Sequence, residues 1–497
     1  MNPRIFLYNG ESRDAADCGG YTGGYTLRKT KIICTIGPAS ANEQTLTRMC
    51  MEGMNVARMN FSHGDHAEQL GKINLVKKVR QQLNLPIAIM LDTKGPEYRL
   101  GCFENKKVSV NTGDTFTFTT RDVLGNQEMV SVSYKKLHKE LRIGDTITAC
   151  NGMVSFRVDK LQDQDIICTV TEGGELADKK SMSFPNKVMH HQYLSKQDQE
   201  DILFGIENDV DFVAASFVST RQDAQELRDF LDRNGGKSID IIAKIENRAG
   251  VDNVDEICQI VDGIMVARGD LGVEIPFVEV PAIQKMLIEK CRLLGKRVIT
   301  ATEMLESMIS NPRPTRAEIS DVANAVYDGS SAIMLSGETA AGKHPVEAVK
   351  FMAQIADFTE QSIDYKHRFY TTSYEIQNNL DAISHATCSM AIDVKARCIV
   401  VNSLSGKTVR MVSRFRCPAQ ILGVTTDEKA WRQLNMSWGV TPVLSEEYNS
   451  LDIVFYQGMQ MAKKIFDLHS GDNVVLTGGL INGTPGNTNV IKMEAVK

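Results

Sequence analysis

Polar side chains recur along the chain directly after short apolar runs. After six of these runs the sequence reads RMNFSHG (58–64), DTKGPE (92–97), KIEN (244–247), ARGD (267–270), TATE (300–303) and SGET (336–339). A single Lys-x-Glu is most often an exposed ion pair. The carboxyl ends of the strands of a parallel barrel meet on one face, where barrel enzymes carry their catalytic groups. Recurrence at successive strand ends therefore predicts one functional site.

Two of these carboxylates, Glu246 and Asp270, follow neighbouring strands, so their oxygens can converge on one hard divalent cation such as Mg²⁺. The alternative is an acidic rim on a soluble barrel. Lys244 and Arg58 at the same rim supply positive charge for an anionic group. Phosphoryl transfer depends mainly on positioning and charge neutralisation, so this combination indicates a phosphate-handling site. No spacing of His and Cys is typical of zinc, and His190-His191 is expected to be structural.

Two segments are typical of helix N-termini. Thr302 precedes an expected helical run, EMLESMI, and Gly269 to Gly272 form an expected tight turn with free backbone N–H groups. Such groups hold carboxylates or phosphates. Ordinary helix capping explains either segment alone.

Two segments resemble phosphate loops. Gly337 to Lys343 has the G-x-x-x-x-G-K spacing, but His344 stands where Ser or Thr would bind Mg²⁺, so we reject it. The segment SLSGKT lies between an expected strand and an expected helix in the third domain, where a second phosphate site and a plain N-cap both remain open. Its candidate effector-binding residues are Ser403, Ser405, Gly406, Lys407 and Thr408. The polar loop 478–488 is long enough to close over such a ligand.

The elements that position the first site are short buried-type strands, each followed by a helical stretch. The expected strands are 31–36, 54–59, 87–91, 210–216, 239–244, 263–267, 297–301 and 332–335. Their number and spacing predict an α/β fold built on a (β/α)8 TIM barrel.

Three further segments complete the expected organisation. Residues 95–192 show the alternating pattern of antiparallel strands, which predicts an inserted all-β lid domain, a β-barrel, over the catalytic face. Expected strands at 397–402, 420–425, 440–444 and 473–477 predict a C-terminal α/β domain. The expected domains are an N-terminal arm (1–28), the barrel (29–94 and 193–360), the lid (95–192) and a regulatory domain (361–497).

Composition excludes several classes of protein. The chain has 497 residues, 42% hydrophobic and 24% charged, with a net charge of -6, which is typical of a soluble multidomain protein without a nucleic-acid partner. No apolar run reaches the length of a membrane span, so no membrane partner is expected. The 11 scattered cysteines contain no C-x-x-C pair, which favours reduced thiols in the cytoplasm.

Taken together, the motifs resemble those of the pyruvate kinase family over nearly all of residues 29–497. They are KIICTIGPAS (31–40), GMNVARMNFSHG (53–64), LDTKGPEYR (91–99), KIEN (244–247), ARGDLGVEIP (267–276), ATEMLESM (301–308), NPRPT (311–315) and LSGETA (335–340). The resemblance implies transfer of the phosphoryl group of phosphoenolpyruvate to ADP, giving pyruvate and ATP in glycolysis. It also implies a homotetramer, Mg²⁺ (or Mn²⁺) and K⁺, and a possible sugar-phosphate effector.

The resemblance further implies a role for each site residue. The catalytic residues would be Lys244, Arg58, Thr302, Ser336 and Glu338, and the substrate would be bound by Arg58, Lys244, Gly269, Asp270 and Thr302. The nucleotide would be bound by Arg58, His63 and Arg99. Mg²⁺ would be held by Glu246 and Asp270, and K⁺ by Asn60, Ser62, Asp92 and Thr93. Lys244 would stabilise the transferring phosphoryl group and the enolate.

Four residues in three segments depart from the usual family pattern. Gln197 replaces a common Lys, Glu303 replaces a common Gln, and Cys150-Asn151 stand where a pair of Asp is frequent. The last change predicts altered lid closure. Two other functions remain as alternatives: a Mg²⁺-dependent pyruvate or oxaloacetate aldolase, and a non-catalytic scaffold that senses sugar phosphates.

Overall fold

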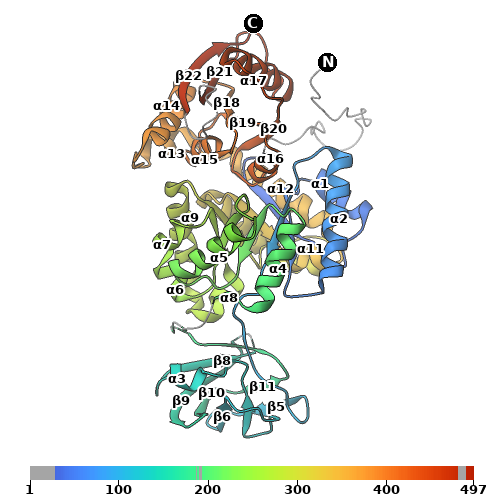
Figure 1. Cartoon of the computed structure of the whole chain (residues 1–497), viewed down its shortest axis with the longest axis vertical. Coiled ribbons are helices and arrows are strands. Elements are labelled where there is room, and N and C mark those ends of the chain that lie inside the picture. Colours follow the sequence, from blue (N-terminus) through green and yellow to red (C-terminus); the bar gives the residue numbers. More distant parts are fainter. Residues whose placement is uncertain (1–27, 151, 186, 188, 190–192, 480–487) are drawn as a thin grey trace.

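The chain folds into three stacked regions, with the barrel between the lid and the C-terminal domain (Figure 1). This computed structural model describes residues 28–150, 152–185, 187, 189, 193–479 and 488–497. Expectations for residues 1–27, Asn151, His190-His191 and 480–487 fall outside the described residues.

Eight parallel strands close the barrel, as expected. In chain order they are β1 (Lys31–Thr35), β2 (Val56–Asn60), β3 (Ala88–Asp92), β13 (Phe212–Ala215), β14 (Asp240–Ile245), β15 (Gly263–Ala267), β16 (Arg297–Ala301) and β17 (Ala332–Leu335). Strand β1 pairs with both β2 and β17, which closes the ring. The expectation of a TIM barrel is therefore confirmed.

Helices cover the outside of the barrel. They are α1 (Glu43–Met51), α2 (His66–Leu83), α4 (Lys196–Glu207), α5 (Arg221–Arg233), α6 (Arg248–Asp252), α7 (Val254–Cys258), α8 (Arg268–Glu274), α9 (Val280–Leu294), α10 (Arg316–Asp328), α11 (Gly337–Ala340) and α12 (Pro345–Gln361), with 3₁₀ helices at Phe277–Glu279 and Glu306–Ile309. Thr315 and Glu318 form the expected capping box at α10. Apolar side chains of the helices pack on the strands in a core that includes Leu46 of α1, Ile73 of α2 and Leu287 of α9.

The interior of the barrel is a packed apolar core. Ile33, Met90, Phe212 and Met265 are among the fully buried side chains that fill it, and Met436 of the C-terminal domain joins the same cluster. The barrel is therefore closed at the end where its strands begin, and polar groups gather at the end where the strands finish.

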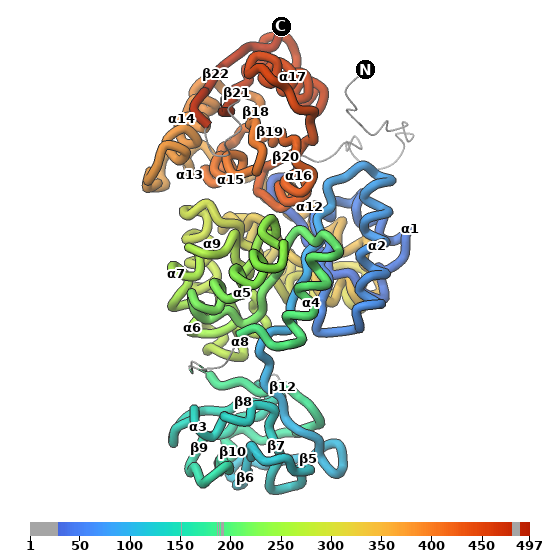
Figure 2. The backbone as a smooth tube through the Cα atoms, viewed as in Figure 1, coloured from blue at the N-terminus to red at the C-terminus, as the bar shows by residue number. Residues whose placement is uncertain are grey.

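The lid leaves the barrel after β3 and the chain returns before α4 (Figure 2). Its elements are β4 (Tyr98–Arg99), β5 (Lys107–Val110), β6 (Thr115–Thr119), β7 (Met129–Ser131), α3 (Leu137–Glu140), β8 (Thr146–Ala149), β9 (Val154–Gln162), β10 (Asp165–Glu172), β11 (Gly174–Ala177) and β12 (Ser181–Ser183). Seven strands pair in the order β4-β12-β8-β9-β10-β6-β7, and β5 and β11 form a two-stranded sheet. An antiparallel bridge between Leu100 and Val132, just after β4 and β7, connects the two edges of the seven-stranded order. Phe116, Phe118 and Phe156 anchor a separate lid core.

The C-terminal domain is a five-stranded sheet with helices. Its elements are α13 (Tyr365–Thr371), α14 (Asn379–Asp393), β18 (Cys398–Asn402), α15 (Lys407–Arg414), β19 (Gln420–Thr425), α16 (Glu428–Leu434), β20 (Val440–Leu444), α17 (Leu451–Ile465), β21 (Asn473–Gly479) and β22 (Thr488–Ala495). The expected strands are present, and β22 adds an antiparallel edge strand that the sequence pattern did not predict.

The C-terminal domain is bound to the barrel through buried polar groups. Arg432 pairs with Asp211 at 2.7 Å, and Asn435 donates to the carbonyl oxygens of Asn55 and Pro86. No helix in the described residues combines the length and apolar character of a membrane span.

Candidate active site

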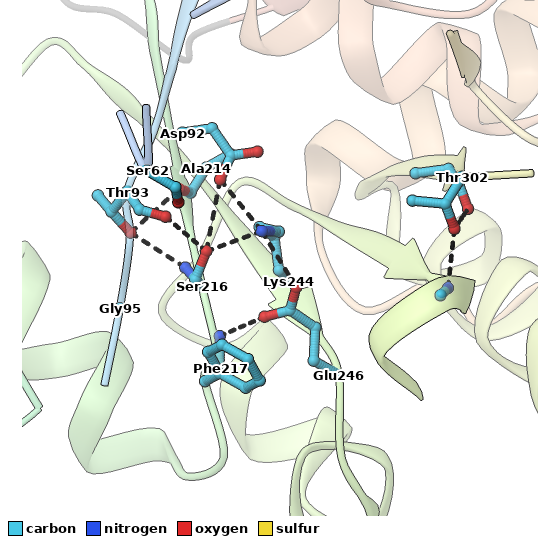
Figure 3. Close-up of polar contacts among 12 residues, drawn as sticks. Ser62, Asp92, Thr93, Gly95, Ala214, Ser216, Phe217, Lys244, Glu246 and Thr302 are labelled. Carbon is cyan, nitrogen blue, oxygen red and sulfur yellow. Dashed lines mark hydrogen bonds and ion pairs between the residues drawn. The ribbon is translucent and has the colours of Figure 1, made fainter. Parts of the chain in front are cut away.

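The ends of strands β2, β3 and β14 bring four charged side chains into one buried network. The Arg58 Nε atom lies 2.6 Å from Asp92 Oδ2, the Lys244 Nζ atom lies 3.1 Å from Asp92 Oδ1, and Nζ also lies 3.0 Å from Glu246 Oε1. All four residues are less than a tenth exposed. Figure 3 shows Asp92, Lys244 and Glu246 pointing toward one another. Spacing in the sequence had predicted this meeting of charges.

Ser216, which the sequence reasoning missed, links this network to the start of the lid. Its hydroxyl accepts from Lys244 Nζ at 2.7 Å and donates to the Thr93 carbonyl oxygen at 2.6 Å. Gly95 packs directly on it, because a Cβ atom at Gly95 would lie 2.7 Å from that of Ser216, and Gly95 has a φ of +71°. Only glycine adopts this conformation freely in so little space.

Burial and pairing set the protonation of the network. Burial would raise the pKa of Asp92, yet Arg58 and Lys244 hold it below its ordinary value. Burial would likewise lower the pKa of Lys244, but Asp92 and Glu246 hold it above its ordinary value, so the amine is charged at neutral pH. Burial raises the pKa of Glu246 to about 8, with Lys244 opposing the rise. The network presents a permanent cation beside a buried carboxyl group whose pKa is raised.

One carboxyl oxygen of Glu246 makes no hydrogen bond to a described residue. Oε2 accepts from the Phe217 backbone N–H at 2.6 Å, whereas Oε1 is fully buried and has no hydrogen-bond partner among the described residues, its contact with Lys244 being a charge contact only. An orphaned buried carboxylate oxygen fits a hard divalent cation. Asp270 lies in the first turn of α8 and is exposed. Within the described residues no three acidic, His or Cys side chains cluster as metal ligands, so further oxygens would have to come from substrate and water.

Thr302 lies on the next part of the rim, at the end of β16. Its hydroxyl accepts from the Gly269 N–H at 2.8 Å and donates to the Ala301 carbonyl oxygen at 2.6 Å. Thr302 and Glu303 both have positive φ, +69° and +54°, which is costly for residues with a side chain and is common at functional sites.

The structure corrects two local expectations here. Thr302 does not begin a helix: the chain bends after β16 and forms only the short 3₁₀ helix Glu306–Ile309, because consecutive left-handed residues cannot enter a helix. The expected tight turn at Gly269 is instead the start of helix α8.

Ser336 and Glu338 follow the last barrel strand, β17. Both carboxylate oxygens of the fully buried Glu338 accept backbone N–H bonds, one from Leu305 at 3.0 Å and one from Ser336 at 2.7 Å. The Ser336 hydroxyl oxygen is buried and has no partner among the described residues. Glu338 therefore shapes the loop after β16, and Ser336 keeps a free hydroxyl.

The proposed K⁺ ligands lie at the ends of β2 and β3. Figure 3 places Ser62 beside Asp92 and Thr93. The side-chain oxygen of Asn60 accepts from the Ser62 N–H at 3.0 Å. All four residues present oxygen donors, which suit a hard monovalent cation, although Asp92 is already paired with Arg58 and Lys244.

The other predicted nucleotide contacts lie apart from the network. His63 is exposed at the rim, and Arg99 pairs with Glu97 at 2.6 Å and donates to the Lys179 carbonyl oxygen. Gln197, in the first turn of α4, donates to Asp201 at 2.9 Å.

Glu274 joins the barrel to the lid. It ends α8 and its carboxylate accepts from the Ser183 side chain and the Phe184 backbone of the lid, while Asp270 of the same helix adds negative charge nearby. Burial, the largest effect, raises the pKa of Glu274 to about 7. Sequence reasoning gave no signal for this contact, since only the fold brings residue 183 beside residue 274.

The second candidate site lies at the C-terminal end of β18. Helix α15 begins after Gly406, whose φ is +71°, and no side chain caps it, so the plain N-cap alternative is not realised. Ser405 and Lys407 are exposed, whereas Thr408 is buried and its hydroxyl lies 2.6 Å from that of Thr488. The Asn402 side chain, immediately before the loop, has both polar atoms buried without a partner among the described residues.

Comparison with known proteins gives one consistent family. The family model described as the pyruvate kinase barrel domain matches residues 27–349, and the model described as the pyruvate kinase alpha/beta domain matches residues 381–494. The pyruvate kinase of Clostridium acetobutylicum is 45% identical over 473 residues, covering 95% of this chain and 100% of that protein. The enzyme of Geobacillus stearothermophilus is 44% identical, covering 94% of this chain and 80% of that protein.

A solved structure agrees with these relatives. The crystal structure of a pyruvate kinase from Cryptosporidium parvum superposes with a TM-score of 0.90 at 38% identity, covering 95% of this chain and 96% of that chain. At this identity the likeness extends beyond the fold to the sequence of the barrel and both other domains.

Proposed function

The chain belongs to the pyruvate kinase family, and from that premise we propose how its own residues divide the work of the reaction. The enzyme transfers the phosphoryl group of phosphoenolpyruvate to ADP, giving pyruvate and ATP. The P–O bond to the enol oxygen breaks, a bond to the terminal oxygen of ADP forms, and the enolate left behind takes a proton at its third carbon. The aldolase and scaffold alternatives are not supported.

Lys244 carries the proposal. Its amine is buried, is held charged by Asp92 and Glu246, and is fixed by Ser216 at 2.7 Å. A fixed cation in a low-dielectric site stabilises charge that develops on the transferring phosphoryl group and on the enolate oxygen. Arg58, anchored by Asp92, adds a second positive charge toward the same phosphate oxygens.

Two cations would complete the charge balance. Glu246 and Asp270 would hold Mg²⁺ (or Mn²⁺), and the orphaned Oε1 atom of Glu246 supports this assignment. When bound, the divalent ion supplies charge neutralisation for phosphate oxygens. Asn60, Ser62, Asp92 and Thr93 would hold K⁺ by their oxygens.

The remaining rim residues would bind and protonate the substrate. The hydroxyl of Thr302, oriented by the Gly269 N–H, would face the substrate carboxylate. The free hydroxyl of Ser336 supports a role in delivering the proton, with Glu338 as a positioning residue, because both of its oxygens are used by backbone N–H groups. Arg58, His63 and Arg99 would contact the nucleotide phosphates.

We propose that lid closure in this protein differs from lid closure in other family members. Cys150 is buried with a φ of +55°, and an uncharged Cys150-Asn151 pair offers no carboxylates to the barrel. Restoring Asp at both positions should lower the KM for ADP. An unchanged KM, with unchanged lid protection in hydrogen exchange, would remove this explanation.

The loop Ser403–Thr408 is the proposed effector site. The uncapped start of α15 and the orphaned side chain of Asn402 support a phosphorylated ligand there. Titration of sugar phosphates against substrate cooperativity, in the parent and in Lys407→Gln, would identify the ligand; a loss of activation in the variant alone is expected.

Assembly and location follow the family. Exposed apolar side chains on the adjacent helices α10 and α12, Ile319, Tyr327 and Phe358, support the proposed homotetramer. Sedimentation of the whole chain tests it. All ten cysteines of the described part are free, which supports a reducing cytoplasm.

One assay tests the central proposal. Pyruvate formation from phosphoenolpyruvate and ADP is measured with K⁺ and with Na⁺ at equal ionic strength, each with and without Mg²⁺. Activity should require Mg²⁺ and fall when Na⁺ replaces K⁺. Equal rates in the two salts would sink the K⁺ assignment, and activity with chelator present would sink the Mg²⁺ assignment.

A further inference from the structure

A second concentration of buried charge lies where the barrel meets the C-terminal domain, at the opposite face from the active site. A small cleft there is lined by residues of both regions. They are Arg292, Gly295, Lys296, Arg297 and Ser331 of the barrel and Arg410, Ser413, Arg414, Arg416, Ser437 and Trp438 of the C-terminal domain. Figure 1 shows α9, which supplies Arg292, and α15, which supplies Arg410, Ser413 and Arg414, facing each other across the junction. The lining is strongly cationic.

The positive charge is not balanced within the protein. Asp240 pairs with Arg297 at 2.7 Å and with Arg410 at 3.8 Å, and Asp381 pairs with Arg414 at 3.1 Å. Asp262 faces the same arginines, and burial raises its pKa, which disfavours its charged form. The carboxylate nearest Arg292 is Glu289, 4.0 Å away and mostly in solvent. Six cationic side chains thus line a cleft with fewer carboxylates than cations.

Three of the arginines are incompletely bonded. The Nε atoms of Arg292, Arg414 and Arg416 are buried and have no hydrogen-bond partner among the described residues. These three residues are no more than 8% exposed. The Arg292 guanidinium makes no hydrogen bond to any described residue, and its one ion pair is the long contact with Glu289. Buried donors without partners are rare and indicate an absent acceptor.

Arg416 is buried beside other cations, and this lowers its pKa. Its Nη2 atom donates to the Gly329 carbonyl oxygen at 3.0 Å and to Ser331 at 3.1 Å, and its guanidinium stacks on Trp438 with 4.6 Å to the ring centroid. Burial first, and then Arg292, lower the pKa of Arg416 to about 9. A bound anion would relieve both effects, because it restores the charge partner that burial removes.

We propose that this cleft binds one small oxyanion of the phosphate class, held by Arg292, Arg414 and Arg416 between the barrel and the C-terminal domain. The forked donors of arginine match a tetrahedral oxyanion. The free space is about 20 Å³, room for about one water-sized group, so the arginine side chains would have to move apart to admit a single phosphate, and a whole nucleotide would not fit. Because the lining comes from two domains, the anion would also tie them together.

Trp438 provides a local reporter for the test. The chain has two Trp residues, so Trp431→Phe leaves Trp438 as the single emitter. Inorganic phosphate is titrated into this variant of the full chain, and the emission of Trp438 is followed. KCl is added to matched ionic strength in a parallel titration. We expect a saturable change with phosphate and none with KCl, while binding at the distant active site leaves the signal unaffected.

Two variants in the same background identify the residues. Arg292→Gln should weaken phosphate binding about tenfold or more, the loss expected for hydrogen bonds to a charged group. Because Arg292 makes no hydrogen bond to a described residue, the Arg292→Gln variant should have the same unfolding midpoint as the parent when phosphate is absent. Lys290→Gln, on the same helix but paired with exposed Asp255, is the matched control and should bind phosphate as the parent does.

The outcomes separate the proposal from a purely structural role. No saturable change, an equal change with KCl, or equal weakening in Lys290→Gln and Arg292→Gln would overturn it. Glycerol phosphate distinguishes the source of the anion: a response that also depends on Arg292 assigns the phosphate group of a metabolite, whereas a response to inorganic phosphate alone assigns the free ion.

Discussion

The face of the barrel where the strands end and the face where they begin both contain buried charge, but the charges are arranged differently. At the strand ends, Arg58, Asp92, Lys244 and Glu246 form one continuous network with a single orphaned oxygen. At the opposite face, Arg432 and Asp211 form a closed pair that joins two domains, and the nearby arginine cleft has a surplus of donors. By our proposal, the first arrangement binds a cation and the substrate. The second joins two domains and, by our inference, binds an anion.

Strained backbone occurs at both faces. Phe217, Thr302 and Glu303, all with positive φ, lie at the strand ends, and Asp209 and Arg416, also with positive φ, lie at the opposite face. Strain persists only where the surrounding structure enforces it. From this comparison we expect that loss of a charge at the strand ends reduces turnover, whereas loss of a charge at the opposite face reduces stability.

The largest expected effect is at the strand ends. Lys244→Met should lower kcat by about 10³-fold, because a fixed cation facing the transition state is lost. The coupled pyruvate assay measures it. Lys285→Met, an exposed residue of α9, serves as the control and should retain full kcat. A Lys244→Met enzyme with more than a tenth of the parent kcat would show that this network is not the catalytic one.

At the opposite face the same kind of change should act on stability. Arg432→Met leaves the fully buried Asp211 without its closest partner and should lower the free energy of unfolding by about 3–5 kcal/mol, with kcat of the folded enzyme within about twofold. Urea denaturation measures the first quantity. Lys429→Met removes a contact with half-exposed Asp209 and should cost less than about 1 kcal/mol. Equal losses of unfolding free energy in the two variants would contradict this distinction between the Arg432–Asp211 pair and the Lys429–Asp209 pair.

A smaller effect should follow from the residue behind Lys244. Ser216→Ala removes the hydroxyl that accepts from Lys244 Nζ and should lower kcat about tenfold, with the KM for phosphoenolpyruvate nearly unchanged. Steady-state kinetics separates the two constants. Ser219→Ala, three residues along the same loop, should change kcat by less than about twofold. A rise in KM alone would mean that Ser216 contacts substrate instead of positioning the lysine.

The smallest expected effect is in the docking of the lid. The pKa of Glu274 is raised from 4.5 to about 7 in the docked structure, so the docked lid retains a proton that a free lid loses. Docking should therefore be strongest below pH 4.5 and should weaken as the pH rises through 7. Hydrogen exchange of β12 at pH 5 and pH 8 measures it, with Glu274→Gln as reference for the intrinsic exchange rate. The two proteins should differ in their pH response; parallel responses would contradict the assignment.

Much of the barrel was predictable because strands buried on both faces appear as uninterrupted apolar runs. Strands β2 and β3 nevertheless end at Asn60 and Asp92, one residue beyond the apolar run in each case, because polar side chains pair inside the mouth of the barrel. Strand β22 was missed because it is an edge strand with mixed exposure, which leaves no regular alternation.

The site was predictable only where charge marks a strand end. Lys244, Glu246 and Asp92 stood out by type and spacing, whereas Ser216 lies in AASF with no charged neighbour to indicate its role. The bend after Thr302 was predicted as a helix because two consecutive left-handed residues without glycine leave no trace in composition. The lid contact of Glu274 depends on tertiary placement, which local sequence does not encode.

The short segment from Thr93 to Gly95 has a consequence for the order of events in a turnover. It is the chain's exit to the lid, and the Thr93 carbonyl oxygen is bonded to the same Ser216 hydroxyl that holds Lys244. Movement of the lid on this segment would therefore displace, through these two hydrogen bonds, the Lys244 amine that we propose to be catalytic. Closure of the lid and alignment of the amine would then occur together. With the lid open, the amine would be misaligned, so hydrolysis of the phosphorylated substrate by water would be suppressed.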